Sequence, residues 1–188
     1  MTVSSVKTGY DGISLLAGNA AYIPNSYESI ATVTVGSAVS SITFSSIPST
    51  YTHLQIRFIA KVATGSGNYF LQFNSDTASN YNSHLLYGSG SSALALADSS
   101  WAGINLVSGS STQFSGGVVD ILDYTNTNKN KTVRTLGGFD ANGSGFVNFY
   151  CGLWRNTAAV TSITIRELIN GSNLTQYSSF ALYGIKGS

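Results

Sequence analysis

The chain has 188 residues, of which 43% are hydrophobic and 12% aromatic, which is enough for one domain with a substantial core. Only 9% of the residues are charged, against about 25% in an ordinary soluble domain, and the net charge is +1. This balance excludes an electrostatic footprint for nucleic acid, and the singly scattered Lys and Arg residues argue against binding to an anionic membrane. A surface of Ser, Thr, Asn and Gly is instead easily buried against another protein, because few ions lose their hydration.

No apolar run follows Lys7, and no segment reaches the ~18 apolar residues of a membrane span, so we expect neither a secretory signal nor a transmembrane helix. The single cysteine, Cys151, cannot form an intrachain disulfide. It lies in an aromatic-rich run at 146–155, and we expect it to be a small buried hydrophobe in a strand.

Residues 1–26 contain large apolar residues interrupted by turn residues, a pattern that buries itself neither as a strand nor as a helix. These residues are Ile13, Leu15, Leu16, Tyr22 and Ile23. One interpretation is a frayed terminus, and the other is an arm that lies on a neighbouring subunit. We favour the arm, because disordered tails are normally poor in large apolar residues.

The clearest strand pattern lies in residues 52–62, directly after the turn that contains Pro48. Apolar and polar residues alternate there with a period of two, which is typical of a half-buried antiparallel strand. We therefore expect Ile56 and Phe58 to be buried and Arg57 to lie on the opposite face. Further strands are expected at 30–35, 41–46, 69–74, 117–124, 131–140, 146–155, 161–168 and 178–186, with Asn-Gly turns at Asn142 and Asn170.

Residues 75–114 have no clear period and are too long for an ordinary connection, so they either have a function or contain short elements of their own. For 93–97 and 103–107, short strands and a helical turn are the alternatives. With about nine or ten strands and no long amphipathic helix, the chain is predicted to be an all-β, antiparallel two-sheet β-sandwich of jelly-roll type over residues 27–188, with residues 1–26 as an extended N-terminal arm.

Candidate catalytic and metal-binding residues are few. Asp120 and Asp123 are three apart and face opposite ways along a strand, so they do not form the carboxylate pair of a glycosidase. His53 and His84 lack ligand spacing for zinc, and the polar run from Asp123 onward lacks the closing Glu of a calcium loop. We expect no enzyme activity, no metal and no cofactor.

The aromatic residues admit two interpretations, because exposed aromatics on a charge-poor sandwich can stack on sugars, whereas others fill the core and subunit interfaces. The core or a subunit interface is expected for Phe44, Phe58, Phe73, Phe146 and Phe149. Three aromatics in the irregular segment remain possible surface-loop contacts: Tyr81, Tyr87 and Trp101.

Several runs of the chain resemble virion structural proteins of tailed bacteriophages. They are ITFSSIPSTYTHLQIRFIAK at 42–61, LQFNSDTASNYNSHLLYG at 71–88, ILDYTNTNKNKTVRTLGG at 121–138, residues 152–156 before VTSITI, and the closing SSFALYGIK. The similarity spans roughly residues 28–187 and consists of strand-and-turn sequence. It implies a capsid or tail appendage with a jelly-roll domain, and it supplies no active-site residues.

The expected function is therefore that of a capsid decoration (cement) protein, which binds the major capsid protein or other virion proteins as a homotrimer. The partner-binding residues would be those of the arm: Ile13, Leu15, Leu16, Tyr22 and Ile23. The alternative is a tail-fibre or baseplate module that binds host surface glycan. Either protein would be made in the host cytoplasm and end up in the virion, with neither nucleic acid nor a membrane as its partner.

Overall fold

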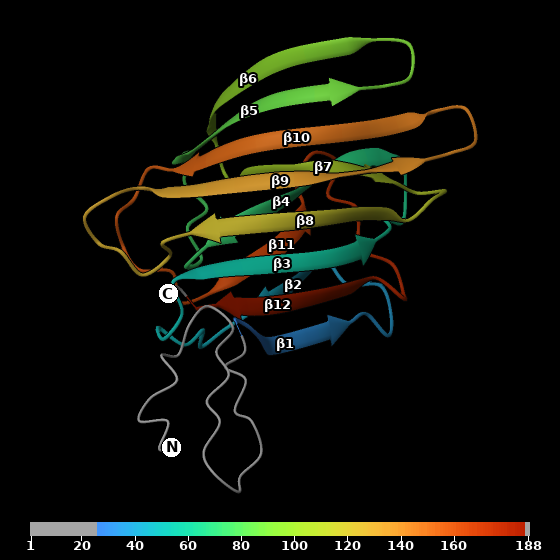
Figure 1. The fold of residues 1–188 in the computed structure, drawn as a ribbon. Helices are drawn as coiled ribbons and strands as arrows, with labels where there is room; N and C mark the ends of the chain where they lie inside the picture. The colour runs from blue at the N-terminus through green and yellow to red at the C-terminus, as the bar shows by residue number, and fades with distance from the viewer. Residues whose placement is uncertain (1–25, 187–188) are drawn as a thin grey trace, which may run out of the picture.

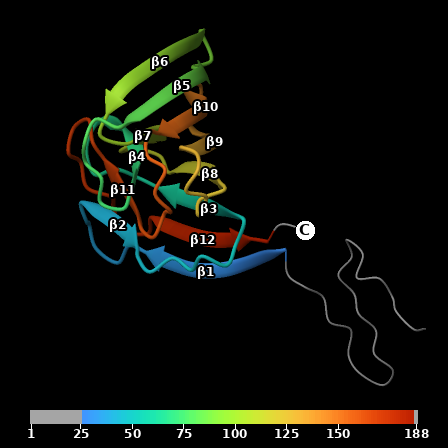
Figure 2. The same ribbon diagram turned by 90° about the vertical axis from the view of Figure 1, so that its left-hand side faces the viewer.

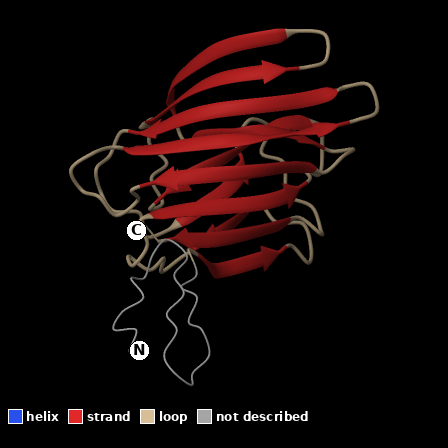
Figure 3. Cartoon of the chain, viewed as in Figure 1, coloured by secondary structure: helices blue, strands red, loops and turns tan. Residues whose placement is uncertain are grey.

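The computed structural model describes residues 26–186, and all regular structure in this range is β-strand (Figures 1 and 3). The strands are β1 (Tyr27–Thr34), β2 (Ser41–Phe44), β3 (His53–Ala60), β4 (Ser66–Phe73), β5 (Tyr81–Gly88), β6 (Ala93–Trp101), β7 (Ile104–Ser110), β8 (Ser115–Leu122), β9 (Lys131–Asp140), β10 (Gly145–Trp154), β11 (Ile163–Glu167) and β12 (Ser179–Ile185).

The strands form two antiparallel sheets that pack face to face. The larger sheet has eight strands in the order β1-β12-β3-β8-β9-β10-β5-β6, and the smaller has four in the order β2-β11-β4-β7. The predicted all-β fold with two antiparallel sheets is confirmed. A jelly roll has eight strands, whereas this sandwich has twelve, so β-sandwich is the description that the topology supports.

The core lies between the two sheets, and β3 supplies its centre. The predicted register of this strand is confirmed, since Ile56 is fully buried, Phe58 is 6% exposed, and Arg57 lies on the exposed face. The Phe58 ring stacks on Phe180 with a centroid distance of 5.6 Å and meets Tyr69 edge-on at 5.7 Å. These three side chains come from β3, β12 and β4, so the cluster joins the two sheets.

The segment 75–114, predicted to be the least regular part of the chain, contains three strands, β5, β6 and β7. Sequence alternation did not reveal them because their burial does not alternate cleanly. Strand β6 is exposed along almost its whole length on both faces, and β7 is buried at nearly every position. Period-two patterning arises only where one face of a strand is wet and the other dry.

The larger sheet is wider than the smaller one. Strand β7, at the edge of the smaller sheet, packs mainly against β9 and β10. Strands β5 and β6 therefore extend past the smaller sheet as a two-stranded ribbon (Figure 2). This overhang positions the candidate site described below.

The expectation that Cys151 is buried in β10 was wrong, and two phenylalanines of this strand lie outside the core. Cys151 and Phe149 lie on the outward face and are exposed, and Phe146 is only partly buried. The inward positions belong instead to Asn148 and Tyr150. Asn148 is accepted in the interior because its Oδ1 receives the Ser108 N–H of β7 at 3.1 Å. The inward face of β10 thus combines the buried rings of Tyr150 and Trp154 with a hydrogen-bonded Asn148.

Candidate protein-binding surface

The β5–β6 ribbon exposes apolar side chains on the face that is turned toward the smaller sheet. Tyr81 and Ser83 of β5 are buried on this face, and strand alternation places Leu85 and Tyr87 on the same side. Their cross-strand partners on β6 are Leu96 for Leu85 and Leu94 for Tyr87. Leu94 and Leu96 are 46% and 51% exposed because the ribbon lies beyond β7.

Strand β6 also ends the larger sheet, so one of its edges has no strand partner within the described residues. It is nine residues long and carries one charged side chain, Asp98. Natural proteins usually protect such edges with lysines, prolines, bulges or short strands, because an open edge is a template for another chain. The length and apolar character of β6 therefore mark this edge as a place where a partner strand can add to the sheet.

A hydrogen-bonded network holds the base of β6 against the rest of the sandwich. The Asn105 amide donates to the Asp98 carboxylate at 3.1 Å, and the Asn68 amide donates to Asn105 Oδ1 at 3.1 Å and to the Tyr150 hydroxyl at 3.4 Å. Burial, followed by the nearby Asp98 carboxylate, raises the pKa of Tyr150 to about 12. The network fixes the ribbon to β4, β7 and β10, so the exposed part of β6 projects from a rigid base.

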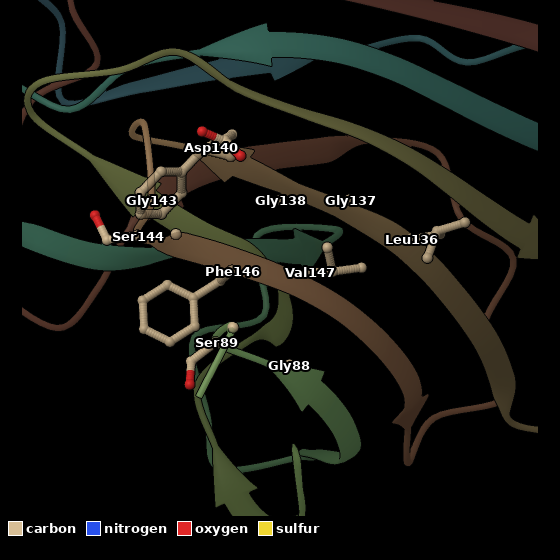
Figure 4. Close-up of a pocket in the computed structure, with 13 residues that line it drawn as sticks. Gly88, Ser89, Leu136, Gly137, Gly138, Asp140, Gly143, Ser144, Phe146 and Val147 are labelled. Carbon is tan, nitrogen blue, oxygen red and sulfur yellow. The ribbon is translucent and has the colours of Figure 1, made fainter. Parts of the chain in front are cut away.

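An aromatic cluster and a hollow lie at the far end of the ribbon. Phe146 meets Tyr87 and Phe139 edge-on, each with a centroid distance of 5.8 Å, and all three rings are partly exposed. Beside them is a hollow of about 640 Å³ between the β9–β10 hairpin and the β5–β6 turn (Figure 4). Its polar side chains come from Ser89, Asp140 and Ser144.

Glycines form much of the wall of this hollow: Gly88, Gly90, Gly137, Gly138, Gly143 and Gly145. Gly138 is required by the close approach of two strands. A Cβ there would lie 1.9 Å from the carbonyl oxygen of Phe146 on β10. Gly138 therefore has no room for a side chain, whereas Gly88, Gly90 and Gly143 border open space.

Tyr81 is not a surface-loop contact, so this expectation was wrong. It lies in β5 and is fully buried, and its ring stacks on Trp154 at 6.2 Å. The Tyr81 hydroxyl donates to the Asp76 carbonyl oxygen at 3.0 Å and accepts the Phe73 N–H at 3.0 Å. Burial raises the pKa of Tyr81, as expected for a core phenol.

The other two aromatic candidates lie in strands and not in a loop. Tyr87 belongs to β5 and to the aromatic cluster at the end of the ribbon. Trp101 ends β6, is 38% exposed, and stacks on Phe70 at 5.5 Å, so one ring face covers the smaller sheet. The arm residues Ile13, Leu15, Leu16, Tyr22 and Ile23 lie outside the described residues.

Leu94 and Leu96 are candidates that the sequence did not reveal. Their signal is the alternation of leucine and alanine at 93–97, for which a short strand and a helical turn were both open. Alanine gives too little contrast with leucine for the pattern to show which face is exposed. The exposure of these leucines is a consequence of their place in the sheet.

The structure brings His53 next to Asp123, since the Asp123 N–H donates to His53 Nδ1 at 2.9 Å. The Asp123 carboxylate also pairs with Lys129, and this ion pair lowers the pKa of Asp123. Asp120 is held elsewhere on the sheet by Gln55 and Arg134. Within residues 26–186 no group of three or more His, Cys, Asp or Glu side chains is placed to hold a metal ion.

The part of the chain that the structure describes contains no helix of the length and apolarity needed to cross a membrane. Neither the protein-family models nor the curated proteins with which the chain was compared gave a match. The class that the observations define is therefore a β-sandwich with an exposed edge ribbon.

Proposed function

We propose that this protein is a structural component of a tailed-bacteriophage virion, and specifically a capsid decoration protein that attaches to the assembled shell. The observation that carries the proposal is β6, a nine-residue edge strand that is apolar and exposed on both faces. An open edge of this kind lets a protein bind a large protein surface, whereas in a protein without a partner the same edge promotes aggregation. The resemblance of residues 28–187 to phage virion proteins supplies the kind of particle.

The attachment would use strand addition. An extended segment of the capsid protein would pair with the open edge of β6, and its alternate side chains would pack on Leu94 and Leu96. Each leucine is about half exposed, so its complete burial would contribute about 1 kcal/mol. The backbone hydrogen bonds of the added strand fix its register, and repetition around the shell multiplies a weak single contact by avidity.

The free-energy cost of removing water from the ribbon is also small. Ala93, Ala95 and Ala97 alternate with the two leucines, and Asp98 is already held by Asn105. A partner can therefore cover the first half of β6 without burying an unpaired charge. The homotrimer expected from the sequence is compatible with this attachment, since a decoration protein repeats the same contact around a symmetry axis of the shell.

The direct experiment measures co-sedimentation of the purified protein with undecorated capsids. We expect Leu94→Lys combined with Leu96→Lys to abolish binding, because the two substituted side chains would bring positive charges into the apolar contact. Ile169→Lys is the matched control, since Ile169 is also 51% exposed but lies in the loop after β11. Equal binding of the double variant and the control would contradict attachment through β6.

A second candidate is a tail-fibre or baseplate module that binds host surface glycan, and the hollow at the end of the ribbon favours it. Phe139 and Phe146 offer ring faces and edges for sugar stacking, while Asp140, Ser89 and Ser144 offer hydroxyl-binding groups. Binding of labelled protein to host cells, lost in Phe146→Ala and competed by free surface polysaccharide, would favour this function. The capsid and cell assays together separate the two candidates.

A further inference from the structure

The outward face of the larger sheet, which lies in front in Figure 1, carries a continuous apolar patch at its centre. Six large side chains there are each more than a third exposed: Ile59, Leu86, Val118, Leu136, Val147 and Phe149. They come from five neighbouring strands, β3, β8, β9, β10 and β5. The smaller sheet packs on the opposite face, so no described part of the chain covers this patch.

The patch is arranged symmetrically about the seam between β8 and β9, the two central strands of the sheet. Val118 of β8 lies directly opposite Leu136 of β9 across this seam. One strand further out on either side, the same row continues with Arg57 on β3 and Phe149 on β10. Val118 and Leu136 are thus equally far from the seam, and so are Arg57 and Phe149.

The neighbouring row repeats this arrangement. Gly116 and Gly138 face each other across the seam, and they leave the centre of the row flat. Ile59 and Val147 occupy the equivalent flanking positions on β3 and β10, and they are 51% and 65% exposed. One exposed apolar side chain therefore lies on each side of a central pair of glycines.

The third row carries one pair of opposite charges at its centre. Asp120 on β8 lies opposite Arg134 on β9, so equivalent positions across the seam have opposite charges. Asp120 accepts the Gln55 amide at 2.9 Å, and its other carboxylate oxygen is 3.8 Å from the Arg134 guanidinium. A face that meets its own copy needs this property, because like charges at equivalent positions would repel each other.

We propose that this outward face binds the same face of a second copy of the chain, about a two-fold axis that runs along the β8–β9 seam. The axis places each residue opposite its counterpart in the other copy, so Val118 meets Leu136, Ile59 meets Val147, and Asp120 meets Arg134. Arg57 lies opposite Phe149 in this arrangement and enters the interface already partnered, since its guanidinium lies over the rings of Tyr27 and Tyr183 and donates to Gln55 Oε1. Two sheet faces stacked in this way form the aligned packing common in β-sandwiches.

A second copy fits this face better than an unrelated protein does, because the complementarity is internal to the sequence of the face itself. In the third row the two aspartates and two arginines of two copies alternate in sign, and Arg57 of the first row meets an uncharged side chain, so no like charges meet in the three rows. This interface is isologous and closes at two copies, whereas a homotrimer requires a head-to-tail contact between different surfaces. It does not involve β6, so its failure would leave attachment to the capsid through β6 untouched. Leu136, Gly138 and Val147 also line the hollow, so dimerisation and glycan binding there would compete.

The test is a charge-reversal experiment on the full chain, read as molecular mass by sedimentation equilibrium. Asp120→Arg places two arginines opposite two arginines, and Arg134→Asp places two aspartates opposite two aspartates. We expect each variant alone to weaken dimerisation by about a hundredfold and to sediment as a monomer. An equimolar mixture of the two variants should restore the dimer, because each copy then faces the opposite charge.

The mixture separates the interface from folding, since the Asp120–Arg134 pair within each copy remains broken in both variants. A second variant, Leu136→Asp, should also be monomeric, with Ile169→Asp as the matched control that stays dimeric. Far-ultraviolet circular dichroism verifies that each variant is folded. A wild-type chain that stays monomeric or is trimeric, or single variants that stay dimeric, would overturn the proposal.

Discussion

The Trp154 indole Nε1 donates a 2.8 Å hydrogen bond to the Asp76 carboxylate, which joins the end of β10 to the turn that follows β4. The same carboxylate accepts the Asn80 amide at 3.0 Å and the Ala78 N–H at 2.9 Å. The Trp154 ring is almost fully buried beside Phe73, with a centroid distance of 5.3 Å. One acidic side chain therefore fixes a turn, a tryptophan and the edge of the core.

This arrangement predicts an acid dependence of stability. Burial opposes the ionisation of Asp76, but hydrogen bonds from Asn80, Trp154 and Ala78 outweigh it and lower the pKa of Asp76 below its ordinary value of 3.8. An acid with a lowered folded pKa stabilises the fold above its unfolded pKa, and this contribution is lost as pH falls through the folded pKa. Asp76→Asn should therefore destabilise the protein near neutral pH and reduce its loss of stability below about pH 4.

Urea unfolding followed by tryptophan fluorescence across the acid range checks this prediction. Asp140→Asn is the control, because Asp140 is exposed and its carboxylate accepts only the local Asn142 N–H in the β9–β10 turn. Parallel stability curves for wild type and Asp76→Asn would show that the Asp76 interactions do not favour the ionised form.

A second prediction concerns the core cluster at the centre of β3. Phe58→Ala should lower the free energy of unfolding by about 3–5 kcal/mol, because it removes an aromatic ring from the contact with Phe180 and Tyr69 and leaves a cavity. Tyr177→Ala, at a residue that is 70% exposed, should change it by about 0.5 kcal/mol or less. Chemical denaturation of both variants measures the difference, and equal effects would contradict the assigned core.

A third prediction concerns Lys131, which is fully buried at the start of β9. Its Nζ donates to the carbonyl oxygens of Asn126, Lys129 and Thr157, and so closes the β8–β9 turn against the segment after β10. Lys131→Met should cost about 1–3 kcal/mol, because three carbonyl oxygens lose their charged donor. Lys129→Met should cost about 1 kcal/mol or less, since its ion pair with Asp123 is exposed.

Thermal unfolding of the two lysine variants, monitored by circular dichroism, provides the comparison. Equal stability of Lys131→Met and Lys129→Met would contradict the prediction. It would mean that water or other donors satisfy the three carbonyl oxygens and that the Lys131 ammonium is not required to hold the turn.

A fourth prediction concerns alkaline pH. Burial raises the pKa of Tyr150 to about 12, so the neutral phenol stabilises the fold. This contribution is complete below the ordinary tyrosine pKa of 10.0 and is lost as pH rises through the folded pKa. Tyr150→Phe should therefore reduce the alkaline loss of stability, while Tyr177→Phe should not. Ultraviolet absorbance of tyrosinate, recorded together with the unfolding signal, tests this, and early ionisation of Tyr150 in the folded protein would contradict it.

The last prediction concerns residues 1–26 and belongs to the proposed function. If Ile13, Leu15, Leu16 and Tyr22 bind the particle, deletion of 1–26 should leave the far-ultraviolet spectrum unchanged and weaken co-sedimentation with undecorated capsids. At about 1.5–3 kcal/mol for each fully buried large side chain, several such residues can offset the entropy of ordering the segment. Full-strength capsid binding by the truncated protein would show that this segment is not an attachment arm.

The sequence by itself determined the fold class and the register of β3. In β3, apolar residues alternate with polar ones because one face is dry and the other wet, and this contrast is a local property that a sequence carries. The Asn142-Gly143 turn and the polar run at 125–130 likewise indicated their hairpins, since the conformations they require are local. Asn170-Gly171 instead leads from β11 in the smaller sheet to β12 in the larger one.

Only the tertiary structure decided which faces are buried where local contrast is weak. Tyr81 is a core residue and Leu94 an exposed one because β5 passes under the smaller sheet at one end and beyond it at the other. Cys151 faces outward because it alternates with Asn148, Tyr150 and Trp154, which are buried against the smaller sheet or hydrogen-bonded inside. Such outcomes depend on which strands become neighbours, and neighbours are set by long-range pairing that no single stretch of sequence contains.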